Sequence, residues 1–243
     1  MKIIVYTSNV GRYDNVRPPA IYDATTPYYY FTDWPVYCEP WVPQPFPKPC
    51  ESKTRNSRIP KILPHLLMDC DYSIYHDANL TLKVTPGEII EKHLGDADVA
   101  FMRHPIRKSV SDEAVRCETA GLVGNGVAQA QAAKYIENGL GSGLWCGGAL
   151  IVRRHGAAVE SFNEIWWREY INGCVRDQIA LPWALKESGV KLHTIEENYS
   201  AWPLLERHFH VAAWPERDDN PSFNEHRKIQ DEREAKLIKL CST

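Results

Sequence analysis

Short runs of β-branched and aromatic residues that alternate with helical patterns constrain this chain more than any other feature. The strand patterns span residues 3–7, 28–32, 71–76, 98–103, 146–153 and 190–195. The helical patterns span residues 85–94, 126–138, 158–170 and 176–187. Strands that alternate with helices are typical of α/β proteins, in which helices flank a mostly parallel sheet. We therefore predict an α/β fold with a mixed, mostly parallel central sheet.

The chain organisation predicts one domain. Its 243 residues contain no internal repeat and no convincing linker, and this length suits a single α/β domain with a well-buried core. We place this domain at residues 1–222. The last segment, residues 223–243, is rich in charge and is expected to form a peripheral helix or a tail.

Local signals set several helix ends. Thr85-Pro86-Gly87-Glu88 is a capping box with proline at the first helical position, so a helix is predicted to begin there. Gly139 stands where a left-handed cap would close the preceding helix. Pro60 is acceptable in the first turn of a helix, whereas Pro64 is expected to kink or shorten the same helix.

A proline-rich segment at residues 35–49 holds six prolines. Proline lacks the amide donor that a helix interior or a central strand needs. We predict an extended loop over the surface. Such a long loop is either a plain cover or a substrate contact, and the residues alone leave both readings open.

Composition limits the classes of function. The net charge of −3 gives no electrostatic footprint for nucleic acid, although a local basic patch would be compatible with it. The sequence contains no run of about 18 apolar residues, so no membrane span is predicted. The first residues are too β-branched for a signal peptide, and the seven cysteines include no CxxC pair. We expect a cytoplasmic protein with reduced thiols, or a Cys38–Cys50 bridge in an oxidising compartment.

The most informative chemistry follows the strand at residues 71–76. Asp77-Ala78-Asn79 places a carboxylate and an amide oxygen two residues apart at the carboxyl end of this strand. In extended geometry such side chains share a face and converge on one cation. Mg²⁺ or Mn²⁺ accepts these oxygen ligands and keeps water or phosphate oxygens in its other positions. Ligands of α/β sheets also bind beyond the carboxyl ends of strands.

Several motifs in the order of the chain resemble the core signature of GT-A glycosyltransferases. The resemblance is to a family long labelled as a domain of unknown function, which includes plant Golgi glycosyltransferases of cell-wall polysaccharide synthesis and bacterial and viral relatives. It covers roughly residues 1–185. The motifs lie at residues 30–33 (YFTD), 58–65 (RIPKILPH), 72–79 (YSIYHDAN), 104–107 (HPIR), 166–169 (WWRE) and 176–178 (RDQ).

The resemblance implies a GT-A (Rossmann-like) fold and a metal site. Asp77 and Asn79 match the family's DxD-type motif, which holds the Mn²⁺ or Mg²⁺ that bridges the donor diphosphate. Asn79 departs from strict Asp-x-Asp and removes one negative charge, which puts the strength of metal binding in question. Enzymes of this kind often add a late histidine ligand, for which His208 and His210 are the candidates.

The resemblance also implies donor contacts. The donor would be a nucleotide-diphospho-sugar, with uridine diphosphate favoured, and the acceptor a glycan or another hydroxyl compound. Tyr6 and Thr7 match the position that cradles the base. The basic pair Arg58 and Lys61 would face the phosphates, for which a guanidinium is well suited. The remaining predicted donor-site residues are Asp33, Gly147, Gly148 and Gln178.

Two residues are candidates for catalysis. Asp177 would support the oxocarbenium-like sugar, or it is simply an acidic residue favoured by the dipole at a helix start. His104 would orient the acceptor or the donor sugar, or cap the end of a strand. The family resemblance favours retention of the anomeric configuration.

Three other classes of protein compete with this interpretation. A non-catalytic carbohydrate-binding protein would explain the tryptophans but not the basic segment that leads to Asp77. A nucleotidyltransferase would normally carry a glycine-rich phosphate loop after the first strand, where this chain has only Gly11. A glycosyltransferase that acts on modified DNA is disfavoured by the acidic balance.

Overall fold

The computed structural model describes residues 1–11, 14, 16–50, 52–104, 106–141, 146–196 and 204–208. The predicted charged segment at 223–243, the end of the predicted domain at 222, and His210 lie outside these residues.

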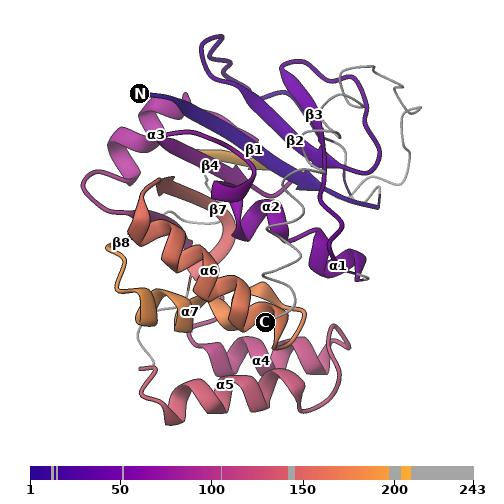
Figure 1. The fold of residues 1–243 in the computed structure, drawn as a ribbon, viewed down its shortest axis with the longest axis vertical. Coiled ribbons are helices and arrows are strands. Elements are labelled where there is room, and N and C mark those ends of the chain that lie inside the picture. The colour runs from indigo at the N-terminus through magenta and orange to yellow at the C-terminus, as the bar shows by residue number, and fades with distance from the viewer. Residues whose placement is uncertain are drawn as a thin grey trace.

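A seven-stranded sheet forms the centre of the fold, in the order β3-β2-β1-β4-β7-β6-β8 (Figure 1). Its strands are β1 (Ile3–Asn9), β2 (Tyr28–Thr32), β3 (Trp41–Pro45), β4 (Tyr72–His76), β6 (Val99–Arg103), β7 (Cys146–Arg154) and β8 (Leu192–Ile195). Every neighbouring pair is parallel except the two that include β7, which runs antiparallel to β4 and to β6. The prediction of a mixed, mostly parallel α/β sheet is confirmed.

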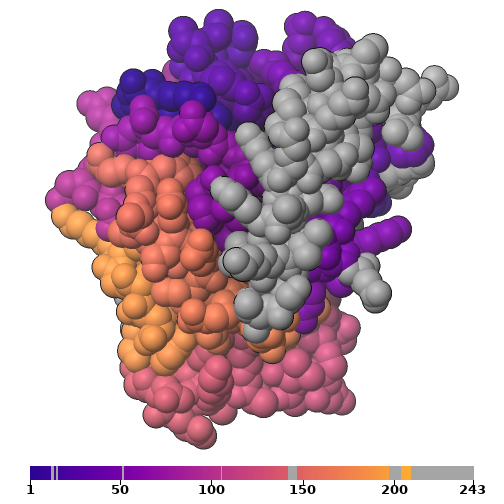
Figure 2. Space-filling model, viewed as in Figure 1, coloured from indigo at the N-terminus to yellow at the C-terminus, as the bar shows by residue number. Residues whose placement is uncertain are grey.

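Helices flank this sheet. They are α1 (Lys53–Asn56), α2 (Ile59–Ile62), α3 (Pro86–His93), α4 (Val110–Thr119), α5 (Val127–Glu137), α6 (Ala157–Ile171) and α7 (Asp177–Ser188). The α4–α5 pair forms one end of the molecule and contacts α7 (Figures 1 and 2). A second, two-stranded sheet joins β5 (Leu80–Leu82) to β9 (Leu205–Arg207) in antiparallel register.

The two faces of the sheet bury separate hydrophobic clusters, because successive side chains of a strand point to opposite faces. Tyr6 of β1 packs in one cluster with Trp166 of α6. Its neighbour Val5 packs in the other cluster with Ile89 of α3. The aromatic stripe predicted for residues 158–170 is therefore core, as the sequence indicated.

A buried arginine connects the sheet to α2. Arg153 of β7 is fully buried and donates hydrogen bonds to the Tyr6 hydroxyl (3.0 Å), the Asn163 side-chain oxygen (3.1 Å) and the Lys61 carbonyl (2.8 Å). Burial lowers the pKa of Arg153 from its usual value. These bonds join β7 to the neighbouring helix α6 and to two segments far away in the sequence, β1 and α2.

The local helix signals behave as predicted. Thr85 and Glu88 form the reciprocal capping box of α3. Gly139 adopts a left-handed conformation, with φ of 83°, after α5. Helix α2 ends at Ile62, and a single 3₁₀ turn begins at Pro64, which confirms that this proline shortens the helix.

The proline-rich segment is not entirely a loop, and this part of the prediction is wrong. Trp41–Pro45 form β3, which pairs with β2 at the edge of the sheet. An edge strand tolerates prolines because the amides on its outer side have no ladder partner to lose. Cys38 and Cys50, which flank this strand, are free thiols, so the alternative of a bridge between them is not realised.

Within the ranges described above, none of the helices combines the length and the apolar composition needed to cross a membrane.

Candidate active site

A cleft of about 210 Å³ opens where three central strands meet. It lies beyond the carboxyl ends of β4 and β6, and beside the start of β7, which reaches the same edge because it runs the other way. This position agrees with the rule for open α/β sheets. The cleft brings together eight predicted site residues: Arg58, Lys61, Asp77, His104, Gly147, Gly148, Asp177 and Gln178.

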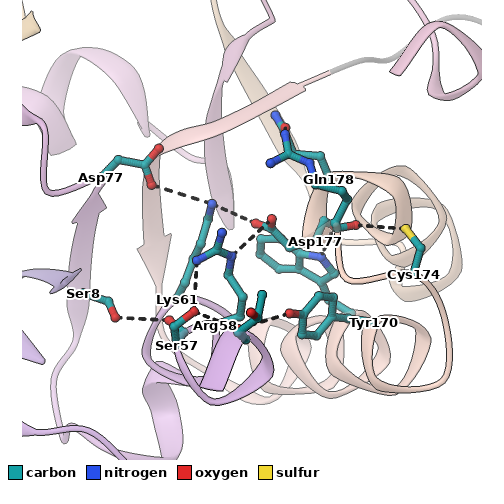
Figure 3. A network of polar contacts seen from close by, with 12 residues as sticks. Ser8, Ser57, Arg58, Lys61, Asp77, Tyr170, Cys174, Asp177 and Gln178 are labelled. Carbon is teal, nitrogen blue, oxygen red and sulfur yellow. Dashed lines mark hydrogen bonds and ion pairs between the residues drawn. The ribbon is translucent and has the colours of Figure 1, made fainter. Parts of the chain in front are cut away.

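An ion-pair network forms the floor of the cleft (Figure 3). The Lys61 ammonium lies 2.8 Å from Asp177 Oδ2, and Arg58 Nε lies 3.5 Å from Asp177 Oδ1. The side chains of Lys61 and Asp177 are only 6% and 4% exposed. Burial alone would raise the pKa of Asp177, but Lys61 and Arg58 outweigh it and hold that pKa well below its usual range. Asp177 is therefore ionised at neutral pH.

Gly148 leaves room for this network. A Cβ at this position would lie 2.8 Å from Lys61 Nζ and 3.0 Å from its Cε. Gly148 was predicted as a donor-site residue, and the group that makes the close approach to it in this structure is the side chain of Lys61. At Gly147 a Cβ would meet only ordinary contacts, 3.7 Å from the Met102 carbonyl oxygen and 3.8 Å from the His104 Cα.

Asp77 stands at the lip of the cleft, with its side chain 42% exposed. Its Oδ1 accepts a hydrogen bond from the Tyr75 hydroxyl (2.9 Å) and lies 3.8 Å from the Lys61 ammonium. Its Oδ2 has no hydrogen-bond or ion-pair partner in the part of the chain that the structure describes. Lys61 thus reaches between two carboxylates, one buried and one open to solvent (Figure 3).

Asn79 is not related to Asp77 by extended geometry, and that premise of the metal prediction is wrong. The Leu80 amide donates to the Asp77 carbonyl (3.0 Å) and closes a turn over Ala78 and Asn79. A turn rather than strand alternation therefore decides where the two side chains point. Asp-x-Asn is itself a typical turn sequence, because both residues tolerate turn conformations.

His208 lies near Asn79, but its ring is engaged elsewhere. The backbone amide of His208 donates to the Asn79 carbonyl (2.8 Å), while its Nε2 lies 2.9 Å from Thr81 Oγ1. The described residues contain no group of three His, Cys, Asp or Glu side chains that could hold a metal. The open Asp77 oxygen, with the Asn79 amide nearby in the chain, suits a hard cation that takes most of its ligands from water or phosphate.

A second wall of the cleft carries His104, Arg176 and Gln178. His104 Nδ1 accepts hydrogen bonds from the backbone amides of Ile106 (3.2 Å) and Arg107 (2.9 Å), which assigns the proton of the neutral ring to Nε2. Burial lowers the pKa of His104, so the ring is neutral at pH 7. Arg176 Nη2 donates to the Gln178 side-chain oxygen (3.0 Å).

Three predicted donor residues do not line the cleft. Strand β1 continues to Asn9, so Tyr6 and Thr7 lie inside the strand rather than at its end. Tyr6 is fully buried, and burial raises its pKa to about 12; Thr7 is 1% exposed. Neither side chain lines the cleft. The predicted end of the strand at Thr7 is wrong, whereas a contact of this segment with a base stays a prediction. Asp33 instead accepts a hydrogen bond from the Gly11 amide (2.8 Å).

The charge of the cleft favours an anion. Four cationic side chains line it, against the two carboxylates of Asp77 and Asp177. The sequence assigned no role to two of these cations, Arg103 and Arg176. Arg176 is the first residue of the RDQ motif at residues 176–178, so it could have been predicted as a site residue. Nothing in the sequence distinguishes Arg103, which ends its strand.

A mostly parallel α/β sheet with a cationic cleft beyond the carboxyl ends of its strands defines the open α/β class of folds, in which ligands bind at that edge. The model of the TOD1/MUCI70 glycosyltransferase-like domain family matches residues 47–196, and the chain belongs to this family. A similar protein is the "Probable hexosyltransferase MUCI70" of Arabidopsis thaliana, 30% identical over 144 residues. The match covers 54% of this chain but only 25% of that relative, so the chain spans about a quarter of its length. The family expected from the sequence motifs is confirmed.

Two solved structures are similar over much of the chain. Mouse xyloside xylosyltransferase 1, in its apo form, has a TM-score of 0.45 and 11% identity, and the similarity covers 80% of this chain and 85% of that one. The bifunctional glycosyltransferase WbbM, also apo, has a TM-score of 0.49 and 11% identity, with 80% and 38% covered.

Proposed function

We propose that this chain is a glycosyltransferase that moves a hexosyl group from a nucleotide-diphospho-sugar, with uridine diphosphate as the favoured nucleotide, to a hydroxyl acceptor such as a glycan. The observation that carries the proposal is the Lys61 ammonium, which is held between buried Asp177 and open Asp77 on the floor of a cationic cleft. Membership of a glycosyltransferase-like family supports it, as does the hexosyltransferase name of the Arabidopsis relative.

Lys61 and Arg58 would stabilise the leaving group. When the bond between the anomeric carbon and the donor phosphate breaks, negative charge grows on the departing diphosphate. Cations that already stand in position stabilise such charge without reorganising during the reaction. Asp177 holds both cations before any ligand arrives, and Gly148 leaves the space that Lys61 occupies.

This arrangement gives Asp177 a different role from the one the sequence suggested. Each of its oxygens is already paired with a cation, so its charge is largely balanced inside the protein. A carboxylate in this state is a weak partner for an oxocarbenium-like sugar. We assign Asp177 as a positioning residue for Lys61 and Arg58, and we assign His104, which lines the cleft with its proton on Nε2, to substrate orientation.

A divalent cation, Mn²⁺ or Mg²⁺, would supply further neutralisation of the diphosphate. Asp77 and Asn79 would hold it at the lip of the cleft, where the unpartnered Asp77 oxygen stands. With both Asp177 oxygens paired, the described cleft offers no unpaired buried carboxylate as a nucleophile. We expect retention of configuration without a covalent enzyme intermediate.

Donor hydrolysis tests the proposal. Purified protein is incubated with a panel of nucleotide sugars, with Mn²⁺ or with chelator, and the release of nucleoside diphosphate is measured. We expect slow release from one donor, its loss in chelator, and a loss of about 100-fold in Asp77→Asn. Asp96→Asn, which removes an exposed carboxylate before the start of β6, at the other end of this strand from the cleft, is the matched control and should behave as the wild type.

Two results would overturn this function. The first is no nucleoside diphosphate from any donor, with sugar binding that needs neither nucleotide nor metal, which would indicate a carbohydrate-binding protein. The second is turnover in Asp77→Asn equal to that of the wild type, which would remove Asp77 from the site.

A further inference from the structure

One buried carboxylate outside the cleft is shared by two arginines. Glu113 of α4 is 2% exposed. Its Oε1 accepts a hydrogen bond from Arg176 Nη2 at 3.0 Å, and its Oε2 lies 3.0 Å from Arg107 Nε. The two arginines come from different segments, the connection between β6 and α4 and the residue that precedes α7. Glu113 therefore joins three elements behind the second wall of the cleft.

Both arginines lead directly to residues that line the cleft. Arg176 lines it and donates to the Gln178 side chain (3.0 Å). The backbone amide of Arg107 donates to His104 Nδ1 (2.9 Å), the bond that fixes the orientation of the ring. Glu113 itself does not line the cleft. Any effect it has on a ligand must pass through His104 or Arg176.

The orientation of Arg176 depends heavily on this carboxylate. Its Nε is buried and has no hydrogen-bond partner among the described residues. Its Nη2 is the atom that bonds both Glu113 and Gln178. A guanidinium held through one nitrogen swings readily when its charged partner is removed, because the remaining amide partner is neutral and weaker.

On the basis of the function proposed above, we infer that Glu113 is a positioning residue that sets Arg176 and His104 for the sugar donor. Two guanidinium groups share this one carboxylate, so the wall keeps an excess positive charge that faces an anionic ligand. The placement of the two cleft residues is completed before the donor binds, which is the condition for efficient electrostatic catalysis.

A second glutamate on the same helix provides a matched control. Glu118 is also buried, at 8% exposure, and accepts hydrogen bonds from the backbone amides of Gly126 (2.8 Å) and Gln129 (2.9 Å). These contacts hold the start of α5, and Glu118 has no contact with the cleft. Glu113→Gln and Glu118→Gln are therefore the same chemical change on the same helix, with and without the connection to the site.

The experiment measures three quantities in both variants: donor hydrolysis, the thermal midpoint, and the pKa of His104 from an NMR pH titration. For Glu113→Gln we expect kcat/KM to fall by about 10- to 100-fold, the effect of a small misplacement of a cleft residue. The pKa of His104 should fall below its wild-type value, because Glu113 raises it whereas Arg107 and Arg176 lower it. Glu118→Gln should lower the thermal midpoint only.

Opposite results would overturn the inference. It fails if Glu113→Gln leaves both kcat/KM and the pKa of His104 at wild-type values, or if Glu118→Gln loses as much activity at equal stability. If Glu113→Gln does not fold, Arg107→Gln replaces it: kcat/KM should again fall and the pKa of His104 should rise, and no change in either would refute the role. The His104 titration needs no substrate, so it tests this inference even if no donor is hydrolysed.

Discussion

Replacing Gly148 with alanine should separate activity from stability. The new Cβ would lie 2.8 Å from Lys61 Nζ, whereas ordinary van der Waals contact begins at 3.4 Å, so the ammonium must retreat by about 0.6 Å to restore an ordinary contact. The atom in the way is the far end of a flexible side chain, and the protein can yield there at low cost. We expect this retreat to lengthen the 2.8 Å contact between Lys61 Nζ and Asp177 Oδ2.

From this displacement we expect a large loss of rate and a small loss of stability. Misplacing a group in a catalytic site by about 1 Å can cost on the order of 100-fold in rate. The free energy of unfolding should change by less than about 1.5 kcal/mol, in the range of a side chain pushed from its preferred rotamer.

Steady-state donor hydrolysis and urea denaturation measure the two effects on the same preparation. Gly147→Ala is the neighbouring comparison, because its Cβ would meet only contacts at 3.7 Å and 3.8 Å. We expect a much smaller loss of rate in Gly147→Ala than in Gly148→Ala. Equal rates in the two variants would refute the idea that Gly148 exists to make room for Lys61.

Further predictions concern the charges and caps. Asp177→Asn should lower the free energy of unfolding by about 3–5 kcal/mol in urea, because it leaves two cations without their buried partner; a change below 1 kcal/mol would contradict this. Because the folded pKa of Asp177 is depressed, its contribution is complete above the unfolded pKa of about 3.9 and is lost as the pH falls below it. The difference in stability between wild type and variant should therefore shrink in titrations below about pH 4, and a constant gap would refute the assignment. Thr85→Ala should cost about 1 kcal/mol by removing the cap of α3, measured by thermal denaturation, and no cost would mean that this cap is dispensable.

The architecture could be predicted from the sequence because its signals are local. Short apolar runs, the Thr85 capping box and the break at Pro64 each act within a few residues, and each appears where expected. Helix α4 was not predicted, because the apolar residues of its buried face are small or do not distinguish a helix from a strand: Val110, Ala114 and Cys117. Their spacing is helical, and Ser109 caps the helix, so a signal was present but weak.

The site was predictable in part. Arg58, Lys61 and Asp77 lie together in the cleft, as the motifs implied. The arrangement around them depends on contacts between distant segments, which no local pattern encodes. Asp177 lies more than 100 residues after Lys61 and reaches it because α2 and α7 both pack against α6. For the same reason the sequence could not show that the hydroxyl of Tyr6, a predicted nucleotide contact, accepts a hydrogen bond from Arg153 in the folded chain.

Lys61 lies on a short helix that is bonded to the central sheet. Helix α2 has four residues, about one turn, and a helix of that length does not survive alone in water. Arg153, a residue of the central sheet, holds this turn in place because its guanidinium donates a hydrogen bond to the Lys61 carbonyl. We therefore expect α2, and with it the Lys61 ammonium, to stay in place as long as the sheet is folded. Amide hydrogen exchange in α2 should then require global unfolding, whereas so short a helix would usually exchange by rapid local fraying.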